Sequence, residues 1–258
     1  MQRRRFLTTS LLALAAGCQL RRFTRSHLRV LSYNIHHGEG IDGRLDLARI
    51  AQVIRESQAD LIALQEVDQG AARTGRVDQA AELGRLTGLH ALFGRAMDFQ
   101  GGAYGQALFS RWPMDGFQVH PLPNPSNREP RIAVSALVQP PGWPRIGFAG
   151  THLDHVGDDG DRWAQAGRLL ELFSGDQPRL LTGDFNATPE SRVMTRLLAH
   201  WRDAAALHPQ PTVPAEAPRR RIDYVLLRPA AAWRVNRVEV MPEAVASDHR
   251  PVLAELAL

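Results

Sequence analysis

The stretch that decides the fold reads Leu180-Leu181-Thr182-Gly183-Asp184-Phe185-Asn186-Ala187-Thr188-Pro189. Its apolar start, from Arg179 to Leu181, predicts a buried strand that ends on a glycine and then presents polar side chains. Residues two apart on a strand point the same way, so we expect Asp184 and Asn186 to face one centre while Phe185 packs behind them. A carboxylate beside an amide indicates that this strand end positions water or a metal ion, rather than supplying a covalent nucleophile.

Other apolar runs of the chain also lead to polar side chains. The runs at residues 28–35, 60–67 and 145–155 lead to Asn34, Glu66 and His152, and the run at 221–227 carries Asp223 within it. A carboxylate at the end of a buried strand is costly unless it is paired or binds a cation, which makes Glu66 a candidate metal ligand. A buried carboxylate next to an imidazole orients the ring, so we expect Asp223 to hold His249, which follows Asp248 in a tight loop.

The order of the predicted elements favours sheets with helices on the outside. Amphipathic patterns predict helices at residues 47–57, 79–89, 161–173 and 191–200, and Asp46 is the expected N-cap of the first helix. Long stretches of strands without helices also occur, which favours a two-layered sheet structure over a parallel wheel of strand–helix units. Because no linker-like change of composition divides the chain, we expect residues 28–258 to form one domain.

Composition and charge are those of an ordinary globular protein. Of the 258 residues, 44% are hydrophobic and 22% are charged, and the formal net charge is +4. All 31 basic residues are Arg, whose rigid and permanently charged fork suits phosphate and carboxylate, although a codon bias toward Arg is the plainer explanation. Loss of residues 1–17 would remove three Arg and no acid, so the remainder is near neutral and does not require a long basic surface for nucleic acid.

Residues 1–18 have the pattern of an export signal. Arg3-Arg4-Arg5-Phe6-Leu7 resembles a twin-arginine signal, and the apolar stretch at 11–16 is too short to span a bilayer. Leu14-Ala15-Ala16-Gly17-Cys18 resembles a lipobox, in which Cys18 becomes a lipidated N-terminus that anchors the protein to a membrane. The alternative is an ordinary signal peptide with an incidental cysteine. We therefore expect an exported bacterial protein, periplasmic or anchored in the outer membrane as a lipoprotein, with an Arg-rich tether at residues 19–27.

The oxygen-rich set of polar residues indicates a hard metal ion. Carboxylate and amide oxygens come from Asn34, Glu66, Asp184, Asn186 and Asp248, and no cysteine accompanies them. Such ligands suit Mg²⁺ or Mn²⁺, with Ca²⁺ as a further candidate. A hard cation, an Asp–His pair and several amides are the equipment for direct attack of water on a phosphodiester.

Six short motifs, taken in order, resemble those of the endonuclease/exonuclease/phosphatase superfamily, which includes DNase I and the neutral sphingomyelinases. They are Ser-Tyr-Asn34, Gln65-Glu66-Val, Thr-His152-Leu, Gly-Asp184-Phe-Asn186, Ile-Asp223-Tyr and Ser-Asp248-His249. The resemblance covers residues 28–258 and implies an α/β (α+β) fold of the DNase I type, a four-layer α/β/β/α sandwich with the site at one end. The segment Asn-Ile-His-His-Gly at 34–38 is similar to a bacterial branch near the sphingomyelinase-type enzymes.

The resemblance also implies roles for individual residues. Asn34 and Glu66 resemble the metal ligands, and Asp248 resembles a further carboxylate on the metal side. Asp184 resembles the residue that orients or deprotonates water, and Asn186 resembles its partner on the phosphate. His249 resembles the catalytic imidazole, Asp223 resembles the carboxylate that orients it, and His152 resembles the phosphate-binding or acid histidine. Whether Asp184 or His249 is the general base, and whether one metal ion or two are bound, stays open at this point.

Three further residues are weaker candidates for contact with the substrate phosphate: Arg131, Gln106 and His36. Gln106 stands where members of the superfamily commonly have Asn. His36 stands where DNA-repair members often have Asp, which argues against an abasic-site enzyme. His37 and His155 are expected to be loop residues, or residues behind the ligands, rather than ligands themselves. Because His36 and His37 are adjacent on an extended loop and face opposite ways, at most one of the two is expected to reach the site.

The predicted function is a divalent-metal-dependent phosphodiesterase that acts as a monomer. Its expected substrate is a phospholipid or another phosphodiester of the cell envelope, which fits the export signal and the near-neutral charge. The first alternative is a secreted or periplasmic endonuclease or exonuclease that acts on nucleic acid, which fits the Arg clusters. The second alternative is a non-catalytic binding module that retains the fold.

Overall fold

The computed structural model describes residues 27–258. The export signal expected at residues 1–18, with Cys18, lies outside the described residues, as does all of the expected tether except His27. Within residues 27–258 no helix is both long and apolar enough to cross a membrane.

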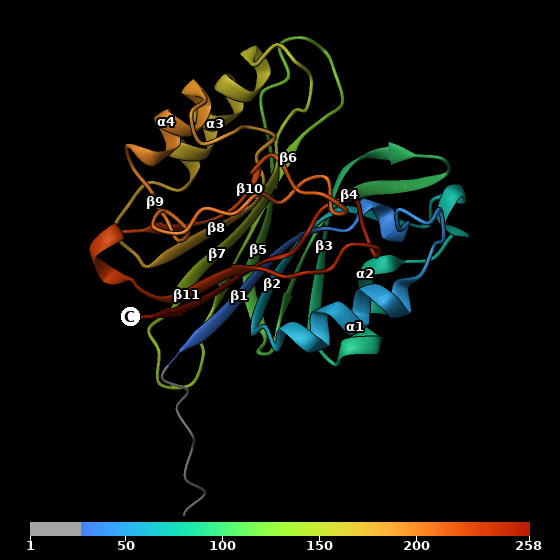
Figure 1. Ribbon diagram of the computed structural model, residues 1–258, viewed down its shortest axis with the longest axis horizontal. Helices are drawn as coiled ribbons and strands as arrows, with labels where there is room; N and C mark the ends of the chain where they lie inside the picture. Colours follow the sequence, from blue (N-terminus) through green and yellow to red (C-terminus); the bar gives the residue numbers. More distant parts are fainter. Residues whose placement is uncertain (1–26) are drawn as a thin grey trace, which may run out of the picture.

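Two six-stranded sheets form the centre of the molecule (Figure 1). The first has the order β11-β12-β1-β2-β4-β3 and the second the order β5-β6-β7-β8-β10-β9. The strands of the first sheet are β1 (Leu28–Asn34), β2 (Leu61–Gln69), β3 (His90–Phe99), β4 (Gly102–Ser110), β11 (Arg234–Val240) and β12 (Val252–Ala257). Those of the second are β5 (Met114–Pro121), β6 (Ile132–Val138), β7 (Ile146–His152), β8 (Arg179–Asp184), β9 (Arg202–Asp203) and β10 (Asp223–Arg228).

Helices cover the outer face of each sheet. Helices α1 (Leu47–Ser57) and α2 (Gln79–Thr87) lie on the first sheet, and α3 (Gly160–Leu172) and α4 (Arg192–Leu198) lie on the second (Figure 1). The apolar side chains between the sheets form a core of their own, in which Val134 and Phe148 pack with Ala63 and Leu108. This arrangement confirms the expected four-layer α/β/β/α sandwich.

Each sheet contains one parallel pair of strands, and both pairs have a helix in the connection. In the first sheet β1 runs parallel to β2, and in the second β7 runs parallel to β8. Helix α1 connects the first pair and α3 the second. Asn34, His152 and Asp184 each end their strand. Glu66 follows Gln65, the last residue of β2 that pairs with β1, but β2 itself continues to Gln69, so the strand end expected at Glu66 is a position within the strand. In such sheets, ligands bind beyond the carboxyl ends of the parallel strands.

Local sequence explains where the helices begin. The Asp46 side chain accepts a hydrogen bond from the backbone N–H of Arg49 and caps α1, as expected. Asp78 caps α2 and Ser191 caps α4 in the same way. The helix expected at 191–200 is shorter in the structure and runs from Arg192 to Leu198.

Two strands were not expected from the sequence. Strand β5 has an irregular mixture of exposed and half-buried residues, so no apolar alternation marks it. It lies at the edge of its sheet and is held by backbone pairing with β6. Strand β9 is two residues long and pairs with β10. Both are defined by tertiary pairing, which sequence periodicity does not report.

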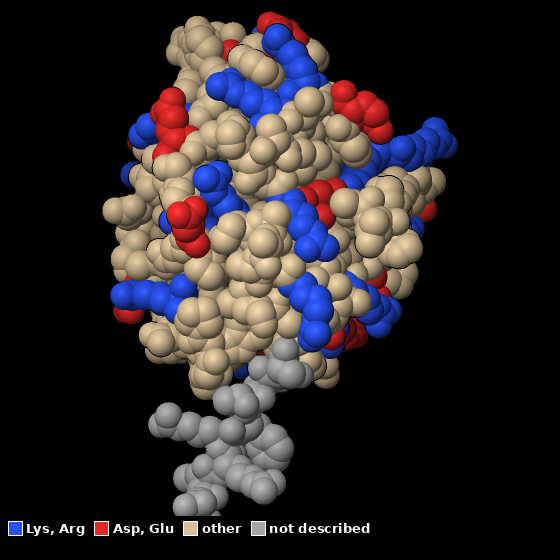
Figure 2. Space-filling view, turned by 90° about the vertical axis from the view of Figure 1, so that its left-hand side faces the viewer, with Lys and Arg blue, Asp and Glu red and all other residues tan. Residues whose placement is uncertain are grey.

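The charged surface residues are mixed in sign. On the face shown in Figure 2, Arg side chains are interspersed with Asp and Glu and with uncharged residues, and no continuous basic band crosses that face. This distribution agrees with the near-neutral charge expected for the chain without its first residues.

Candidate active site

A pocket of ≈ 350 Å³ lies where the polar strand ends of the two sheets meet. Its lining includes these residues singled out in the sequence: His36, Glu66, Arg131, His152, Asp184, Asn186, Asp248 and His249. Asn34 and Asp223 lie directly behind the lining, where each is about 1% exposed and contacts a lining residue. The structure therefore brings together the ten residues of these two groups, while their chemical roles stay predictions.

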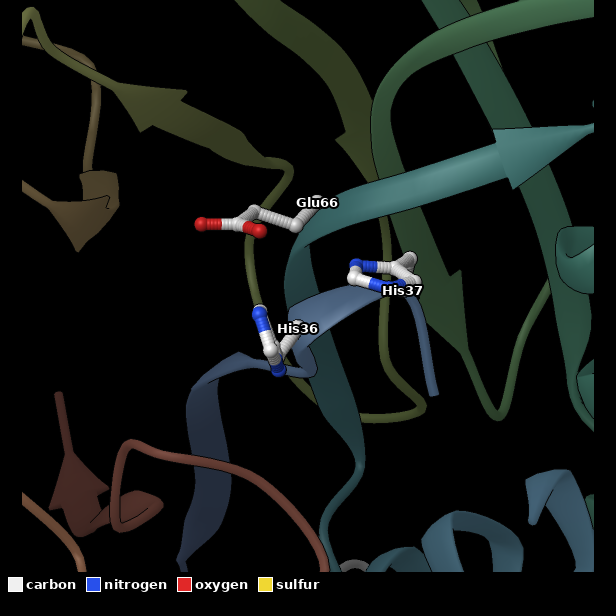
Figure 3. Close-up of side chains that lie close together, drawn as sticks. All are labelled: His36, His37 and Glu66. Carbon is white, nitrogen blue, oxygen red and sulfur yellow. The ribbon is translucent and has the colours of Figure 1, made fainter. Parts of the chain in front are cut away.

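A β-bulge turns Glu66 toward the pocket. Strand β2 pairs with β4 in regular register up to Leu64 and again from Val67, and one extra residue of β2 is accommodated between them. Glu66 lies in this irregular segment and has a left-handed φ of +58°. Bulges re-aim side chains in this way beside functional sites. Figure 3 shows the Glu66 side chain leaving its strand together with His36 and His37 of a neighbouring turn.

The strand that contains Asp184 ends in a tightly built turn. Gly183 has a φ of +151°, and a Cβ at this position would lie 2.0 Å from the carbonyl oxygen of Thr151. The backbone N–H of Asn186 donates to Oδ1 of Asp184 at 2.9 Å, and the Asn186 side chain donates to the Leu153 carbonyl at 3.1 Å. Asn186 has a φ of +49°, which Asn tolerates better than most residues, and both polar side chains consequently face the pocket.

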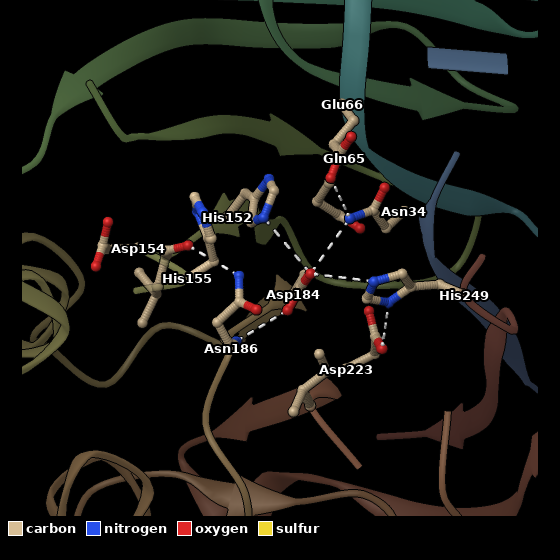
Figure 4. Close-up of polar contacts among 12 residues, drawn as sticks. Asn34, Gln65, Glu66, His152, Asp154, His155, Asp184, Asn186, Asp223 and His249 are labelled. Atoms are coloured by element: carbon tan, nitrogen blue, oxygen red, sulfur yellow. Dashed lines mark hydrogen bonds and ion pairs between the residues drawn. The ribbon is translucent and has the colours of Figure 1, made fainter. Parts of the chain in front are cut away.

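Oδ2 of Asp184 is the point at which the polar groups converge (Figure 4). The Asn34 amide nitrogen donates to it at 3.2 Å and to Oε1 of Glu66 at 2.9 Å. Nε2 of His152 lies 3.5 Å from the same oxygen, and Nε2 of His249 lies 3.7 Å from it. Asn34 thus links the carboxylate of the first sheet to that of the second.

Asp223 holds the imidazole of His249 as the sequence predicts. Nδ1 of His249 lies 3.0 Å from Oδ2 of Asp223, and the Thr212 hydroxyl donates to the same oxygen at 2.5 Å. Asp223 is paired in register with Asp184 across the antiparallel β10–β8 pair, which explains why the two buried acids lie side by side. A carboxylate can only accept from Nδ1–H, so this contact directs Nε2 of His249 toward Asp184 and the pocket.

Burial and neighbouring charges change the protonation of this group. Burial, together with the charge of Asp223, raises the pKa of Asp184 to about 7. Burial disfavours the charged imidazole of His249, but the carboxylates of Asp223 and Asp184 outweigh that effect and raise its pKa to about 10. For His152, burial and then the charge of Arg131 lower the pKa well below its usual value. His152 is therefore neutral near pH 7, and its contact with Asp184 is not an ion pair.

The three weaker candidates lie in different surroundings. Arg131 is buried at the pocket, where its Nη2 donates to Nδ1 of His155 at 3.1 Å and its Nε has no hydrogen-bond partner. His36 lines the pocket beside Glu66. Gln106 does not line it: its side chain is buried and donates to the carbonyl oxygen of Ile132 at 2.8 Å, which makes it a link between the two sheets.

Sequence reasoning missed the residues that form one wall of the pocket. Met97, Phe99 and Tyr104 come from the β3–β4 hairpin, and Arg73 comes from the short helical turn η2 (Ala72–Thr74). Arg73 is held by two hydrogen bonds to Asp68 at 2.7 and 2.9 Å and lies 4.5 Å from the centre of the Phe99 ring. None of these residues belongs to a strand-end motif, so no sequence signal marked them.

Two groups of three residues in the described chain could hold a metal ion: His36 with His37 and Glu66, and Asp184 with Asp223 and His249. In the second group Asp223 already accepts hydrogen bonds from Thr212 and His249. That group is accordingly organised for proton transfer, and the Glu66 side of the pocket is the better place for a cation.

Comparisons with known proteins agree with this geometry. Residues 31–249 match the Endonuclease/Exonuclease/phosphatase family. The chain is 25% identical to the "Uncharacterized protein YbhP" of Escherichia coli strain K12 over 254 residues, covering 89% of this chain and 96% of that protein. A solved endonuclease/exonuclease/phosphatase from Beutenbergia cavernae is 28% identical with a TM-score of 0.75, covering 91% of this chain and 72% of that one.

A mannosyl-6-phosphatase of Bacteroides thetaiotaomicron shares the fold, with 20% identity and a TM-score of 0.73 over 90% of this chain and 100% of that one. Members of the matched family are hydrolases of phosphoester bonds, and their fold generally uses a divalent metal ion. Since the match extends from the first strand to the imidazole of His249, this chain belongs to the endonuclease/exonuclease/phosphatase family.

Proposed function

We propose that this protein hydrolyses a phosphodiester by direct attack of water, without a covalent enzyme intermediate. The observation that carries the proposal is the Asn34 amide, which donates both to Glu66 on the first sheet and to Asp184 on the second. This amide connects the Glu66 carboxylate, which can bind a cation, with the Asp184 carboxylate, which can accept a proton from water. Both face one pocket of ≈ 350 Å³, large enough for a phosphodiester group with part of its alcohol.

The residues on the Glu66 side fit a divalent cation. Glu66 faces the pocket and accepts one hydrogen bond, from Asn34 at Oε1, while Asp248 lines the same pocket. Carboxylates left with free lone pairs at a pocket wall suit Mg²⁺ or Mn²⁺, and Ca²⁺ as a third candidate. When bound there, the cation would neutralise charge on the phosphoryl group.

The residues around Asp184 account for the remaining chemistry. In the proposed reaction, Oδ2 of Asp184 takes a proton from the attacking water, whose oxygen forms a bond to phosphorus. The bond between phosphorus and the leaving oxygen breaks at the same time, and that oxygen takes a proton from solvent water to become the free alcohol. His249, held by Asp223 at 3.0 Å, donates through Nε2–H to a phosphoryl oxygen. Arg131 offers its unpartnered Nε–H to the same group.

We further propose that the substrate is a phospholipid or another phosphodiester of the cell envelope. The apolar side chains of Met97 and Phe99 beside the polar centre support an acyl-bearing or otherwise apolar alcohol. Nucleic acid is the alternative substrate, and the guanidinium groups of Arg73 and Arg131 at the pocket favour it. A groove for a long polyanion would require more cationic side chains in a row than the pocket lining supplies.

The test is a turnover panel of sphingomyelin, phosphatidylinositol, plasmid DNA and a chromogenic phosphodiester, run separately with Mg²⁺ and with Mn²⁺. We expect turnover of a lipid and a loss of about 10³-fold or more in Asp184→Ala and His249→Ala. The matched controls Asp176→Ala and His200→Ala replace exposed residues and should keep wild-type rates. Turnover of DNA alone would select the nuclease, and no turnover of any substrate would favour a binding module.

We also propose, from the sequence of the first 18 residues, that the protein is exported and anchored through Cys18. Membrane fractionation of the full chain tests this: Cys18→Ser should release the protein into the soluble periplasmic fraction. Unchanged membrane association of Cys18→Ser would contradict the lipid anchor while leaving the phosphodiesterase proposal untouched.

A further inference from the structure

We propose that His36, His37 and Glu66 form a binding site for a divalent transition-metal ion of the Mn²⁺, Co²⁺ and Zn²⁺ class, in preference to Mg²⁺. The inference rests on the proposed function in one respect, because it names the ion that the Glu66 side of the pocket would take. It differs from the sequence-based expectation, in which at most one of the two adjacent histidines reaches the site.

The three side chains converge from two elements: His36 and His37 belong to the turn that follows β1, and Glu66 belongs to β2. One potential ligand atom of each lies within 4.8 Å of those of the other two, and the two imidazole rings have centroids 4.5 Å apart at an angle of 63° (Figure 3). Adjacent residues of an extended loop would face opposite ways. His36 and His37 instead both have left-handed backbone conformations, with φ of +46° and +45°, which brings their rings to the same side.

The hydrogen bond of His36 leaves the correct nitrogen free for a metal. Nδ1 of His36 lies 3.1 Å from the backbone carbonyl oxygen of Glu39. A carbonyl oxygen can only accept, so Nδ1 carries the hydrogen and Nε2 keeps its lone pair. Metal-ligating histidines in proteins nearly always donate their other ring nitrogen in this manner, which fixes both the tautomer and the ring orientation.

His37 also has one ring nitrogen near Glu39, and its other ring nitrogen has no hydrogen-bond partner. Its Nε2 lies 3.5 Å from the Glu39 carboxylate, while its Nδ1 is buried and has no hydrogen-bond partner. The residue as a whole is 8% exposed, so solvent does not compensate. A buried nitrogen without a partner is costly, and a cation bound to its lone pair would remove that cost. Glu39 thus orients both imidazoles, one through its backbone and one through its side chain.

The local charges are favourable for a cation. Glu66 accepts a hydrogen bond at Oε1 only, from Asn34, and the Glu39 carboxylate lies behind His37. Arg73 is the cationic side chain on this side of the pocket, and two hydrogen bonds tie it to the buried carboxylate of Asp68. This side of the pocket thus has three carboxylates, those of Glu66, Glu39 and Asp68, and one guanidinium, so its net charge favours a cation.

The ligand chemistry selects the ion class. Two imidazole nitrogens and one carboxylate oxygen suit the first-row transition ions, whereas Mg²⁺ prefers oxygen ligands and retains its waters. The remaining coordination positions would face the pocket that also contains Asp184 and His249. A metal bound through three protein ligands with open positions can accept a substrate oxygen.

The test uses the metal-free folded protein and does not depend on turnover. Co²⁺ is titrated in while its visible absorption is recorded, and Zn²⁺, Mn²⁺ or Mg²⁺ then compete for the site. We expect a Co²⁺ band that Zn²⁺ abolishes and that Mg²⁺ displaces only at concentrations on the order of 100-fold higher. His36→Gln and His37→Gln should each weaken Co²⁺ binding by about 10- to 100-fold. His200→Gln, an exposed control, should bind as the wild type does.

Unchanged Co²⁺ affinity in both His36→Gln and His37→Gln would overturn the inference, as would displacement of Co²⁺ by Mg²⁺ at equal concentration. Circular dichroism of each metal-free variant checks the fold, and His36→Gln is the safer variant because His36 is only half-buried. Failure of the proposed function is distinguishable: histidine-dependent Co²⁺ binding without phosphodiesterase activity under any ion would sustain this site and reject that activity.

Discussion

At the scale of single residues, the site depends on how Asp184 is surrounded. It is almost fully buried, it ends a strand, and it shares its surroundings with Asp223 and His249. Two buried carboxylates this close disfavour each other's ionisation, and the imidazole between them relieves part of the cost. The protons of this group are therefore shared, and pH is the most direct way to test its role.

The rate of hydrolysis should depend on pH in a bell shape. It rises as Asp184 loses its proton, near its pKa of about 7, and falls as His249 loses its proton, near its pKa of about 10. The negative charge of Asp223 raises both pKa values, so Asp223→Asn should move both limbs to lower pH in the residual kcat/KM profile. Limbs that stay in place in Asp223→Asn would contradict this account.

Asp184→Asn should lose activity but gain stability at alkaline pH. The folded-state pKa of Asp184 lies above its unfolded value, so the stabilisation from its proton is complete below about pH 4 and is lost as pH rises through about 7. An uncharged amide avoids this loss, and we expect a higher free energy of unfolding by about 2 kcal/mol at pH 8.

Urea unfolding of the metal-free wild type and Asp184→Asn at pH 8 and pH 4 measures the difference, which should vanish at the lower pH. The exposed Asp176→Asn is the matched control and should show no such pH dependence. A variant less stable than the wild type at pH 8 would show that Asp184 is not a strained buried acid.

At the scale of elements, strand ends and one bulge define the site. The bulge at Glu66 and the turn after Gly183 both break regular strand geometry where side chains must face the pocket. At Gly183 the carbonyl oxygen of Thr151, on the neighbouring strand, occupies the space a Cβ would need. Strained backbone conformations, such as the positive φ of Glu66 and Gly183, cluster at functional sites, where the surrounding structure holds them.

Gly183→Ala should test this close approach. Because the new Cβ would lie 2.0 Å from the Thr151 oxygen, β7 and β8 must separate, and we expect a loss of about 3 kcal/mol or more in the free energy of unfolding. Gly175→Ala is a matched control, since Gly175 also has a positive φ, +108°, but has no atom within 4 Å of the added Cβ. It should cost about 1 kcal/mol.

Activity provides the second measurement for these two variants. Separation of β7 from β8 displaces His152 relative to Asp184, which are paired in register, so Gly183→Ala should also lose hydrolysis. Equal stability and equal activity of the two variants would show that strand proximity at Gly183 does not control the site.

At the scale of the whole molecule, the two sheets depend on one shared core. Phe148 of the second sheet and Leu108 of the first belong to the same buried cluster between the layers. Both sheets contribute residues to the pocket, so loss of packing between them would separate Glu66 from Asp184. The sandwich core is consequently a requirement of the site as well as of stability.

Phe148→Ala should destabilise both sheets together. Removal of this fully buried ring is expected to lower the free energy of unfolding by about 3–5 kcal/mol. Circular dichroism and Trp fluorescence should still change in a single coincident transition in urea. Val119→Ala, at a 39% exposed position of the edge strand β5, should cost less than about 1 kcal/mol. Two separate transitions in Phe148→Ala would show that the sheets are independent.

The sequence was sufficient to predict the layers and most of the polar strand ends. Buried strands are long apolar runs, amphipathic helices have a period of their own, and a polar residue such as Asp184 after an apolar run marks a strand end. Glu66 also follows an apolar run, but it lies at a bulge within β2, which continues to Gln69. The edge strand β5 and the wall formed by Met97 and Phe99 carry no such local pattern, because pairing and convergence in space define them.

By itself, then, the sequence determined most of the segments that form strands and helices and most of the polar residues that meet at the pocket, because each segment carries its own pattern of burial and periodicity. The chemical roles of those residues stay predictions. The tertiary structure alone decided the partners: Asn34 between Glu66 and Asp184, and Gln106 as a link between sheets rather than a pocket residue. It also placed His36 and His37 on one side of a left-handed turn beside Glu66. Such contacts depend on register, bulges and backbone handedness, which packing between distant segments sets and which no single segment encodes.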